Sequence, residues 1–560
     1  MQNLNAGGMG DSISNMSTQA VVKPFFFLYG PSGSGKSVVG RQLADSLDAS
    51  FIDLDERIAQ TAGCTIPEIF SREGESGFRQ RERTALREVC RDETNGLQAD
   101  TKRRKPSVIA LGGGALLDAE NRALAEACGT VICLSASFDT LLSRLQAQAD
   151  GRPLLAGNLQ ERLQDMLSRR QAHYASFECV DTEGLTPAEV AWQLQIRLGI
   201  FHVRGMGEGY DIFVASHLLE RLGEACRERG LGGPIALVSD EHVARWIAPR
   251  VIASLEGAGY PVRPVIIPAG ETHKTVATVQ LIWQAFADGG LERQSTVIAL
   301  GGGVVNDLAG FAAATYLRGV RWVACPTSLL AMVDASLGGK TGVDLPQGKN
   351  LVGAFYPPAL VLSDPDCLQT LPREELRSGM AEVVKHGVIA DPQLFAQCAS
   401  LPAIEQMEAV VRRAAAVKVG VIQADPYERG ARAVLNLGHT IGHALEKVTV
   451  YALRHGEAVS IGMVCAASLS QALGLAQDGL EEEISSVLRS LGLPTEIPPG
   501  LNRAAILDAM RHDKKRTGGK FRFVLPVHIG KVVHGVEVAE SLVQLILRAK
   551  AMTPFSGSEK

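Results

Sequence analysis

An apolar run that breaks into three consecutive glycines constrains the fold of this chain most. Residues 296–300 (TVIAL) are followed at once by Gly301, Gly302 and Gly303. Such a run predicts a buried parallel strand, and the glycines let the backbone turn sharply and approach a ligand closely. The helix expected over about 305–317 would offer free N–H groups and a positive dipole end to a pyrophosphate. The turn therefore predicts a dinucleotide site in an α/β fold.

A second glycine-rich turn lies near the start of the chain. Residues 30–37 read GPSGSGKS, between an expected strand over 22–29 and a helical stretch VVGRQLADSL. In a G-x-x-x-x-G-K-S loop the backbone around Gly33 and Gly35 cradles phosphates, Lys36 reaches the β/γ oxygens and Ser37 ligates magnesium. This loop predicts a site for ATP with Mg²⁺, and a turn of purely structural origin would not need both glycines, the lysine and the serine.

Composition limits the partners and the compartment. A length of 560 residues favours three or four folding units, and 46% hydrophobic with 21% charged residues is ordinary for globular proteins. A net charge of −5 provides no basic field for nucleic acid or an anionic membrane, so we expect neither partner. Ten cysteines without a C-x-x-C pair, together with a polar start that is neither a signal peptide nor a membrane span, favour a reduced, cytoplasmic protein.

The first module resembles the shikimate kinase family. Beside the phosphate loop, the resemblance rests on FIDLD (51–55), GFRQRE (77–82), LGGG (111–114) and GRPLL (151–155). We expect residues 51–55 to form a second buried strand that ends in two carboxylates. It implies phosphorylation of shikimate from ATP, with Asp53 near magnesium and Asp55 beside the attacking hydroxyl. It also implies that Arg152 neutralises the transferring phosphoryl group. The remaining shikimate contacts implied by the resemblance are Asp55, Arg79, Gly113 and Arg170.

The second module resembles the 3-dehydroquinate synthase family. The resemblance rests on ALGGGVVNDLAGF (299–311), PTSLLAMVDASLGGKTGVDLPQGKN (326–350), GMAEVVKHG (379–387), NLGHTIGH (436–443) and RHGEAV (454–459). It implies NAD and a Zn²⁺ (or Co²⁺) ion held by Glu382, His439 and His455. Spacing alone points elsewhere, because His439 and His443 lie four residues apart on one helix face. The resemblance leaves His443 to the substrate.

The same resemblance distributes the other polar residues of the second module. Those expected at the cofactor are Asp240, Glu271, Lys274, Gly301, Gly302, Gly303, Asp307, Thr327, Ser328, Asp334, Lys340 and Lys349. Those expected at the substrate are Arg318, Asn350, Lys418 and Lys515, and those expected in catalysis are Lys385, Arg432, Asn436 and His443. Lysine, arginine and amide groups in this number suit a substrate that carries a phosphate and a carboxylate.

The implied domain order follows the two modules. We expect a disordered extension (1–20), a P-loop kinase domain with a parallel sheet and flanking helices (21–198) and a linker (199–207). An α/β NAD-binding domain (208–370), an all-α metal- and substrate-binding domain (371–552) and a disordered tail (553–560) would follow. The synthase reaction implied by the resemblance converts 3-deoxy-arabino-heptulosonate 7-phosphate to 3-dehydroquinate plus phosphate, and the resemblance also implies a homodimer through the second module.

Three alternatives remain at this point. The second module could act on sedoheptulose 7-phosphate, or it could be a metal-dependent polyol dehydrogenase, although a dehydrogenase would not need the phosphate-binding cations. The first module could be a nucleotide sensor, although Lys36 and Asp55 are both present.

Overall fold

The computed structural model describes residues 25–95, 105–147, 158–512, 516–517 and 520–550. The chain divides into two compact units. Unit 1 comprises Met1–Leu194 with Glu228–Gly230, and unit 2 comprises Gln195–Arg227 with Leu231–Lys560. The predicted extension (1–20), the predicted tail (553–560), Arg152 and Lys515 lie outside the described residues.

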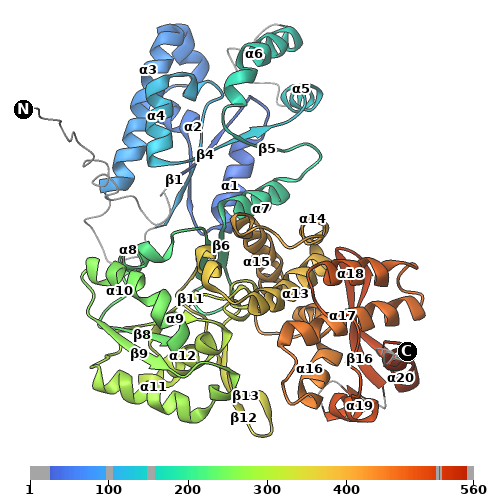
Figure 1. The fold of residues 1–560 in the computed structure, drawn as a ribbon. Helices are drawn as coiled ribbons and strands as arrows, with labels where there is room; N and C mark the ends of the chain where they lie inside the picture. Colours follow the sequence, from blue (N-terminus) through green and yellow to red (C-terminus); the bar gives the residue numbers. More distant parts are fainter. Residues whose placement is uncertain (1–24, 96–104, 148–157, 513–515, 518–519, 551–560) are drawn as a thin grey trace, which may run out of the picture. The chain divides into compact units, whose positions relative to one another are not determined.

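Unit 1 is built on a five-stranded parallel sheet in the order β2-β3-β1-β4-β5. Its strands are β1 (Phe25–Tyr29), β2 (Ser50–Asp53), β3 (Ser107–Ala110), β4 (Gly129–Ser135) and β5 (Glu178–Asp181). Its helices are α1 (Lys36–Ser46), α2 (Leu54–Ala62), α3 (Ile66–Asn95), α4 (Ala119–Cys128), α5 (Phe138–Gln146), α6 (Leu159–Tyr174) and α7 (Pro187–Leu198). Helices flank the sheet on both faces (Figure 1), as predicted for the kinase module.

Unit 2 begins with a seven-stranded sheet in the order β6-β7-β14-β11-β10-β8-β9. All of its pairings are parallel except that of β6 with β7. Its strands are β6 (Ile200–Val203), β7 (Tyr210–Val214), β8 (Ile235–Asp240), β9 (Val262–Ile267), β10 (Thr296–Gly301), β11 (Arg321–Pro326) and β14 (Leu360–Ser363). The helices of this part are α8 (Leu222–Glu228), α9 (Glu241–Trp246), α10 (Ala248–Gly257), α11 (Val276–Asp288) and α12 (Gly303–Thr315). Strand β10 and the turn after it therefore occur where the sequence predicts them.

The strand order locates the ligand edge of this sheet. From β8 the chain continues outward to β9, then returns to β10 and proceeds to β11 on the other side. The crevice between β8 and β10 is thus a topological switch point, where α/β sheets bind ligands at the carboxyl ends of their strands. The predicted cofactor residues Asp240 and Gly301 end these two strands.

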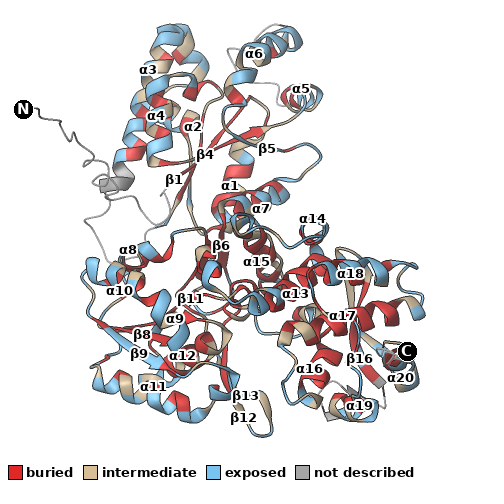
Figure 2. Cartoon of the chain, viewed as in Figure 1, coloured by how far each residue is buried: buried red, intermediate tan, exposed pale blue. Residues whose placement is uncertain are grey.

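The rest of unit 2 is mainly helical. It contains α13 (Arg373–Ala390), α14 (Pro392–Gln397), α15 (Met407–Ala424), α16 (His439–Val448), α17 (His455–Ala472), α18 (Leu480–Ser490), α19 (Arg503–His512) and α20 (Glu540–Ala549). Helix α17 is buried along most of its length (Figure 2), because neighbouring helices pack around it. It forms the centre of this part of the unit.

Three details differ from the sequence prediction. The predicted all-α part contains an antiparallel sheet of β15 (Arg516–Thr517), β16 (Lys520–His528) and β17 (Lys531–Ala539). The predicted linker 199–207 contains β6, which pairs with β7 and extends the sheet of unit 2. The predicted strand 51–55 ends at Asp53, whose side chain accepts from the N–H groups of Asp55 and Glu56 and so caps α2.

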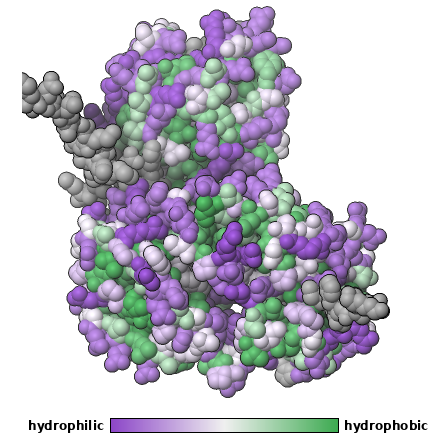
Figure 3. Space-filling model, in the orientation of Figure 1, coloured by the Kyte–Doolittle hydropathy of each residue, from purple (hydrophilic) through white to green (hydrophobic). Residues whose placement is uncertain are grey.

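None of the described helices meets the requirements of a membrane span. Within the described ranges, no helix combines the length and the apolar character that a membrane span requires. On the face seen in Figure 3, hydrophobic residues are scattered among hydrophilic ones. All ten cysteines lie in the described part of the chain, and none forms a disulfide.

Candidate active sites

In the phosphate loop of unit 1, the side chain of Lys36 is hydrogen-bonded to backbone carbonyl groups of the loop. The Nζ atom of Lys36 donates to the carbonyl oxygens of Gly30 and Pro31, at 2.9 Å each. Gly30 has a φ of 128°, and a Cβ there would lie 2.2 Å from the carbonyl oxygen of Leu134, so only glycine fits this turn. The loop is therefore shaped before any phosphate arrives, with an ammonium group at its centre.

A cavity of about 620 Å³ adjoins this loop. Its lining includes the predicted residues Gly33, Gly35, Lys36, Ser37, Asp53, Asp55, Arg79, Gly113 and Arg170. The hydroxyl of Ser37 donates to Oδ2 of Asp53 at 2.5 Å, so the two predicted magnesium ligands already touch. The predicted phosphate, magnesium and shikimate residues that are described thus share one cavity.

Two arginines are held at the rim of the β3 turn, which carries Gly113. Arg79 donates from Nη1 to Oε2 of Glu82 at 2.7 Å, and Arg170 donates from Nη1 to the carbonyl oxygen of Gly113 at 3.2 Å. A Cβ on Gly114 would lie 2.7 Å from Nη2 of Arg79. Glycine at position 114 therefore leaves room for the Arg79 guanidinium, which a larger residue would displace.

Sequence reasoning missed two residues of this cavity. Glu82 is buried, and burial raises the pKa of its carboxyl although Arg79 acts in the opposite direction. It lies three residues after Arg79 on one helix face, which is the signal that could have revealed it. Arg144 donates to the hydroxyl of Thr182 at 2.9 Å and to its carbonyl oxygen at 3.0 Å. No motif in the sequence singles out Arg144.

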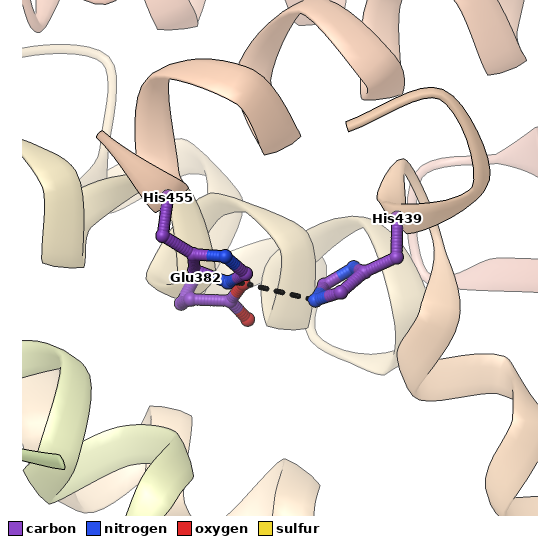
Figure 4. Close-up of side chains that lie close together, drawn as sticks. All are labelled: Glu382, His439 and His455. Atoms are coloured by element: carbon purple, nitrogen blue, oxygen red, sulfur yellow. Dashed lines mark ion pairs between the residues drawn. The ribbon is translucent and has the colours of Figure 1, made fainter. Parts of the chain in front are cut away.

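In unit 2, three predicted metal ligands converge on one point. Glu382 comes from the middle of α13, whereas His439 and His455 are the first residues of α16 and α17. One ligand atom from each lies within 4.8 Å of the others. Figure 4 shows the two imidazoles directed toward the carboxylate. Oε1 of Glu382 lies 3.3 Å from Nε2 of His455 and 3.6 Å from Nε2 of His439.

The donor atoms of this cluster suit a cation. Glu382 is fully buried, its Oε2 forms an ion pair with Lys385, and its Oε1 faces the two imidazoles. Burial alone would raise its pKa, but Lys385 and the two histidines hold that pKa well below its usual range. A buried carboxylate that stays ionised and faces two imidazole nitrogens is the donor set of a zinc or cobalt site.

The orientation of the His439 imidazole supports the same conclusion. Nδ1 of His439 lies 3.0 Å from the carbonyl oxygen of Leu437, which can only accept, so Nδ1 carries the proton and Nε2 keeps its lone pair. Burial, followed by Lys385, lowers the pKa of His439 well below its usual value. His439 is therefore neutral and ready to bind a cation.

His443 contributes to a neighbouring group of side chains. Its ring centroid lies 5.2 Å from that of His439 and 6.3 Å from that of His455, and the side chain is exposed. Ligand atoms of His443, Glu446 and His455 also approach one another within 4.8 Å. His455 thus belongs to two clusters, but only the cluster with Glu382 and His439 is built from buried or half-buried side chains throughout.

Glu446 was not anticipated from the sequence. Its buried carboxylate places Oε2 at 3.5 Å from Nδ1 of His455 and Oε1 at 3.2 Å from Nζ of Lys349. It follows His439 by seven residues and His443 by three, so all three share one face of α16. That spacing is the signal that could have found it.

The residues predicted to bind the nucleotide, here called the nucleotide side of unit 2, centre on Lys274. This lysine is buried and donates to Oδ2 of Asp307 at 2.5 Å and to Oδ1 of Asn350 at 2.6 Å. Burial raises the pKa of Asp307 to about 6, although Lys274 opposes the shift. Lys274 follows the short helix η5 (Glu271–His273). Its contacts connect this segment with α12 and with the hairpin formed by β12 (Lys340–Leu345) and β13 (Gly348–Phe355).

The glycine turn itself is held by neighbouring side chains. Nδ2 of Asn306 donates to the carbonyl oxygens of Gly301 and Gly302, at 2.9 Å each, and the N–H of Thr327 donates to that of Gly301 at 3.0 Å. A Cβ on Gly302 would meet the Ser328 hydroxyl at 3.4 Å. Asn306 is a further residue that sequence reasoning passed over, although it lies within the quoted motif.

Helix α15 and a π-helical turn connect the nucleotide side with the metal cluster. This turn, η7 (Ala331–Ala335), packs against Gly303, where a Cβ would lie 3.2 Å from that of Ala335. Lys418 of α15 donates to both the carbonyl oxygen and Oδ1 of Asp334, at 2.6 Å each. Ligand atoms of Asp334 and Glu382 lie within 4.8 Å, so η7 spans from the glycine turn to the metal cluster.

The remaining predicted residues surround this centre less closely. Arg432 is buried and donates to the carbonyl oxygen of Pro426 at 2.9 Å, and Lys340 forms an ion pair with Glu428. Asn436 ends the short helix η10 (Ala431–Asn436). Arg318 follows α12, where it is exposed and has a φ of 67°. The structure therefore gives no support for its predicted place at the substrate.

Fold and site define the class of this chain before any comparison with known proteins. A P-loop cavity lies in one unit, and a Glu/His/His cluster beside a glycine turn lies in the other. The class is a polypeptide with two enzyme domains, one with a phosphate loop and one with a glycine turn near a candidate metal site.

Comparison with known proteins names both domains. Residues 32–198 match the family described as shikimate kinase, residues 264–378 match 3-dehydroquinate synthase N-terminal, and residues 379–516 match 3-dehydroquinate synthase C-terminal. The 3-dehydroquinate synthase of Nostoc punctiforme is 44% identical over 350 residues, which cover 61% of this chain and 96% of that protein. That of Desulforamulus reducens is 44% identical over 358 residues, covering 62% and 99%.

Solved structures with similar folds include two other synthases. The 2-epi-5-epi-valiolone synthase of Streptomyces hygroscopicus, with NAD⁺ and Zn²⁺ bound, has a TM-score of 0.56 and 31% identity, covering 61% of this chain and 96% of that chain. A 2-deoxy-scyllo-inosose synthase complexed with carbaglucose-6-phosphate, NAD⁺ and Co²⁺ has a TM-score of 0.57 and 26% identity, covering 63% and 100%. The chain belongs to the 3-dehydroquinate synthase family and carries a fused shikimate kinase domain, so one polypeptide joins these two activities of the shikimate pathway.

Proposed function

We propose that the 620 Å³ cavity of unit 1 is where ATP and shikimate meet. Lys36 exchanges its two carbonyl partners for phosphate oxygens, and Ser37 with Asp53 provides the magnesium side of the loop. Asp55 receives the attacking hydroxyl, while Arg79, Gly113 and Arg170 hold the acceptor. The chemistry requires mainly positioning and charge neutralisation, to which Arg152 contributes by the resemblance alone.

For unit 2 we propose that the β8–β10 crevice holds NAD and that Glu382, His439 and His455 hold Zn²⁺ or Co²⁺. Bound NAD⁺ would accept and return a hydride, and the bound ion would act as a Lewis acid on the oxidised carbinol. Lys274 and Asp307 fix the turn on which the nucleotide rests, together with Asp240, Glu271, Thr327 and Ser328.

The chain's cations then hold the rest of the substrate. Lys385 forms an ion pair with Glu382, Lys418 contacts Asp334 of η7, and Lys418 and Arg432 are both buried. Lys340, Lys349 and Asn350 on the β12–β13 hairpin, with Asn436 and His443, add donors for a phosphate and a carboxylate. The proposed assignments of Arg318 and Lys515 rest on the resemblance.

The single observation that carries this proposal is the convergence of Glu382, His439 and His455 next to η7, which itself touches the glycine turn. Identity to curated 3-dehydroquinate synthases (44%) exceeds identity to the 2-epi-5-epi-valiolone synthase (31%), which favours the heptulosonate over another sugar phosphate.

Phosphate release from purified protein tests the substrate assignment. We expect rapid release from 3-deoxy-arabino-heptulosonate 7-phosphate, dependence on added NAD after the cofactor is stripped, and no net formation of NADH. Faster release from sedoheptulose 7-phosphate would indicate a different cyclase, and stoichiometric NADH would indicate a dehydrogenase. Homodimerisation through unit 2 stays a prediction, which light scattering of the purified chain would test.

A further inference from the structure

His455 has two ring nitrogens with different neighbours. Nε2 lies 3.3 Å from Glu382 inside the metal cluster, whereas Nδ1 lies 3.5 Å from Oε2 of Glu446 on the opposite edge. Only one ring nitrogen of an imidazole can bind a given ion. If Nε2 binds the ion, Nδ1 is the nitrogen that contacts Glu446. Both neighbours are carboxylates, which can only accept. Glu446 would keep a proton on Nδ1, so that a cation bound beside Glu382 would meet the lone pair of Nε2.

Glu446 itself is held firmly. Its side chain is 4% exposed, and it comes from α16, the helix that also presents His439. Its second oxygen, Oε1, lies 3.2 Å from Nζ of Lys349, which in turn lies 3.3 Å from Oε1 of Glu271 and 4.5 Å from the ring centre of Tyr451. The carboxylate therefore has one oxygen for His455 and one for the β12–β13 hairpin.

The two histidines of the cluster are oriented by different means. His439 uses the backbone carbonyl of Leu437, at 3.0 Å from Nδ1. His455 lies at the start of α17, and the contact that the structure shows for Nδ1 is with a carboxylate. Carboxylates in this position raise the basicity of a ligating imidazole and fix its ring, and their loss typically weakens metal affinity by about 10- to 100-fold.

We propose that Glu446 is a positioning residue that fixes the tautomer and the ring orientation of His455 for metal binding, and that Lys349 ties it to the nucleotide side of the site. This inference rests on the proposed metal site. It adds a residue that touches neither the ion nor the substrate, and it makes the hairpin that carries Lys349 part of the support of the metal.

Zinc affinity of the full chain tests the inference. The protein is stripped with a chelator and titrated with Zn²⁺ in competition with a chromophoric chelator, and the visible absorption of the Co²⁺ form is recorded. For Glu446→Ala we expect zinc affinity about 10- to 100-fold weaker and an altered Co²⁺ spectrum. Glu446→Gln should lose less affinity, because its amide oxygen still accepts from Nδ1.

Glu481→Gln is the matched control. Glu481 is a half-buried glutamate of α18 that pairs with Lys550 and accepts from Ser468, outside the metal cluster. Its change should leave zinc affinity and the Co²⁺ spectrum as in the wild type. If Glu446→Ala misfolds, Glu446→Gln, which keeps the size of the side chain, decides the question by its spectrum and affinity.

The outcomes separate this inference from the proposed function. Wild-type affinity and an unchanged Co²⁺ spectrum in both Glu446 variants would overturn the inference while leaving the metal site intact. A wild-type protein that binds neither Zn²⁺ nor Co²⁺ would overturn the metal site and the inference together.

Discussion

At the residue scale, the site of unit 2 depends on charges that are buried in opposed pairs. Lys418 and Asp334 are joined by two contacts of 2.6 Å. Burial lowers the pKa of Lys418 to about 8, and Asp334 only partly offsets this effect. A lysine that titrates near neutral pH makes the charge of the pocket depend on pH.

The synthase should therefore lose activity on the alkaline side. Above pH about 8 the neutral Lys418 no longer contributes positive charge to the pocket, so kcat/KM should fall with an apparent pKa near 8. Lys418→Met should reduce kcat/KM by about 100-fold and abolish this limb of the profile. An unchanged alkaline limb in the variant would show that another group controls it.

Stability should respond to the same group with the opposite sign. An unfolded lysine has a pKa of about 10.4, so the unfolded chain binds one more proton than the folded chain between about pH 8 and 10.4. Titration of Lys418 therefore raises the free energy of unfolding over this window, whereas activity falls. Urea unfolding of wild type and Lys418→Met across these pH values would measure the difference.

Lys36 should serve only the kinase. Lys36→Met removes the ammonium group that lies at 2.9 Å from the loop carbonyls, so shikimate phosphorylation should fall by about 1,000-fold or more. Phosphate release by unit 2 should be unchanged in the same preparation. Assays of both activities on one sample check this, and a joint loss without unfolding would contradict the separation of the two sites.

At the element scale, glycines allow α16 and α17 to approach each other closely enough for their first residues to share an ion. A Cβ on Gly462 of α17 would lie 1.9 Å from the carbonyl oxygen of Gly438, the residue before α16. A Cβ on Gly456 would lie 2.0 Å from the carbonyl oxygen of Ser378 in α13. The positions of His439 and His455 thus depend on glycine at 456 and 462, because any larger residue would clash with the neighbouring backbone.

Gly462→Ala should consequently separate the two helices. We expect a loss of about 1–3 kcal/mol in the free energy of unfolding, together with weakened zinc affinity, because a methyl group cannot fit against the Gly438 carbonyl. Gly257→Ala is the control, since no described atom lies within 4 Å of a Cβ at that position in α10. Equal stability and zinc affinity of Gly462→Ala and wild type would contradict this account.

Sequence reasoning reached the strands and their glycine turns because apolar runs and glycines carry local signals. The sequence did not predict the sheet of β15–β17, because these strands lie near the end of the chain between segments of helical character. The metal ligands came from the family resemblance, since spacing alone favours His439 with His443. The structure supports the proposed set through Glu382, which lies on another helix than His439 and contacts His455. The contact between Glu446 and His455 joins two helices, so no single segment of the sequence reveals it.

At the scale of the whole molecule, each unit contains its own candidate site among the described residues. The described kinase residues lie in unit 1, and both the nucleotide and the metal residues lie in unit 2. Strand β6 belongs to the sheet of unit 2, so the boundary between the two activities lies before residue 200, and residues 200–203 of the predicted linker are part of unit 2.

Separately expressed fragments should therefore stay active if they are cut at this boundary. Fragments 1–198 and 199–560 should keep their kinase and synthase activities within a small factor of the full chain. Fragment 205–560 lacks β6, which leaves β7 as an unpaired sheet edge, and should unfold at a lower temperature or aggregate. Thermal unfolding and initial rates check this, and collapse of either well-cut fragment would show that the fusion supports catalysis.

The metal content of His455→Ala, measured together with both activities on the same sample, tests the central claim most directly. The account predicts a wild-type chain that binds one zinc or cobalt ion per synthase site. It predicts a variant that loses the ion and phosphate release from the heptulosonate while phosphorylating shikimate at the wild-type rate. A folded variant that keeps its ion and still releases phosphate would contradict the assignment of Glu382, His439 and His455 as the metal centre.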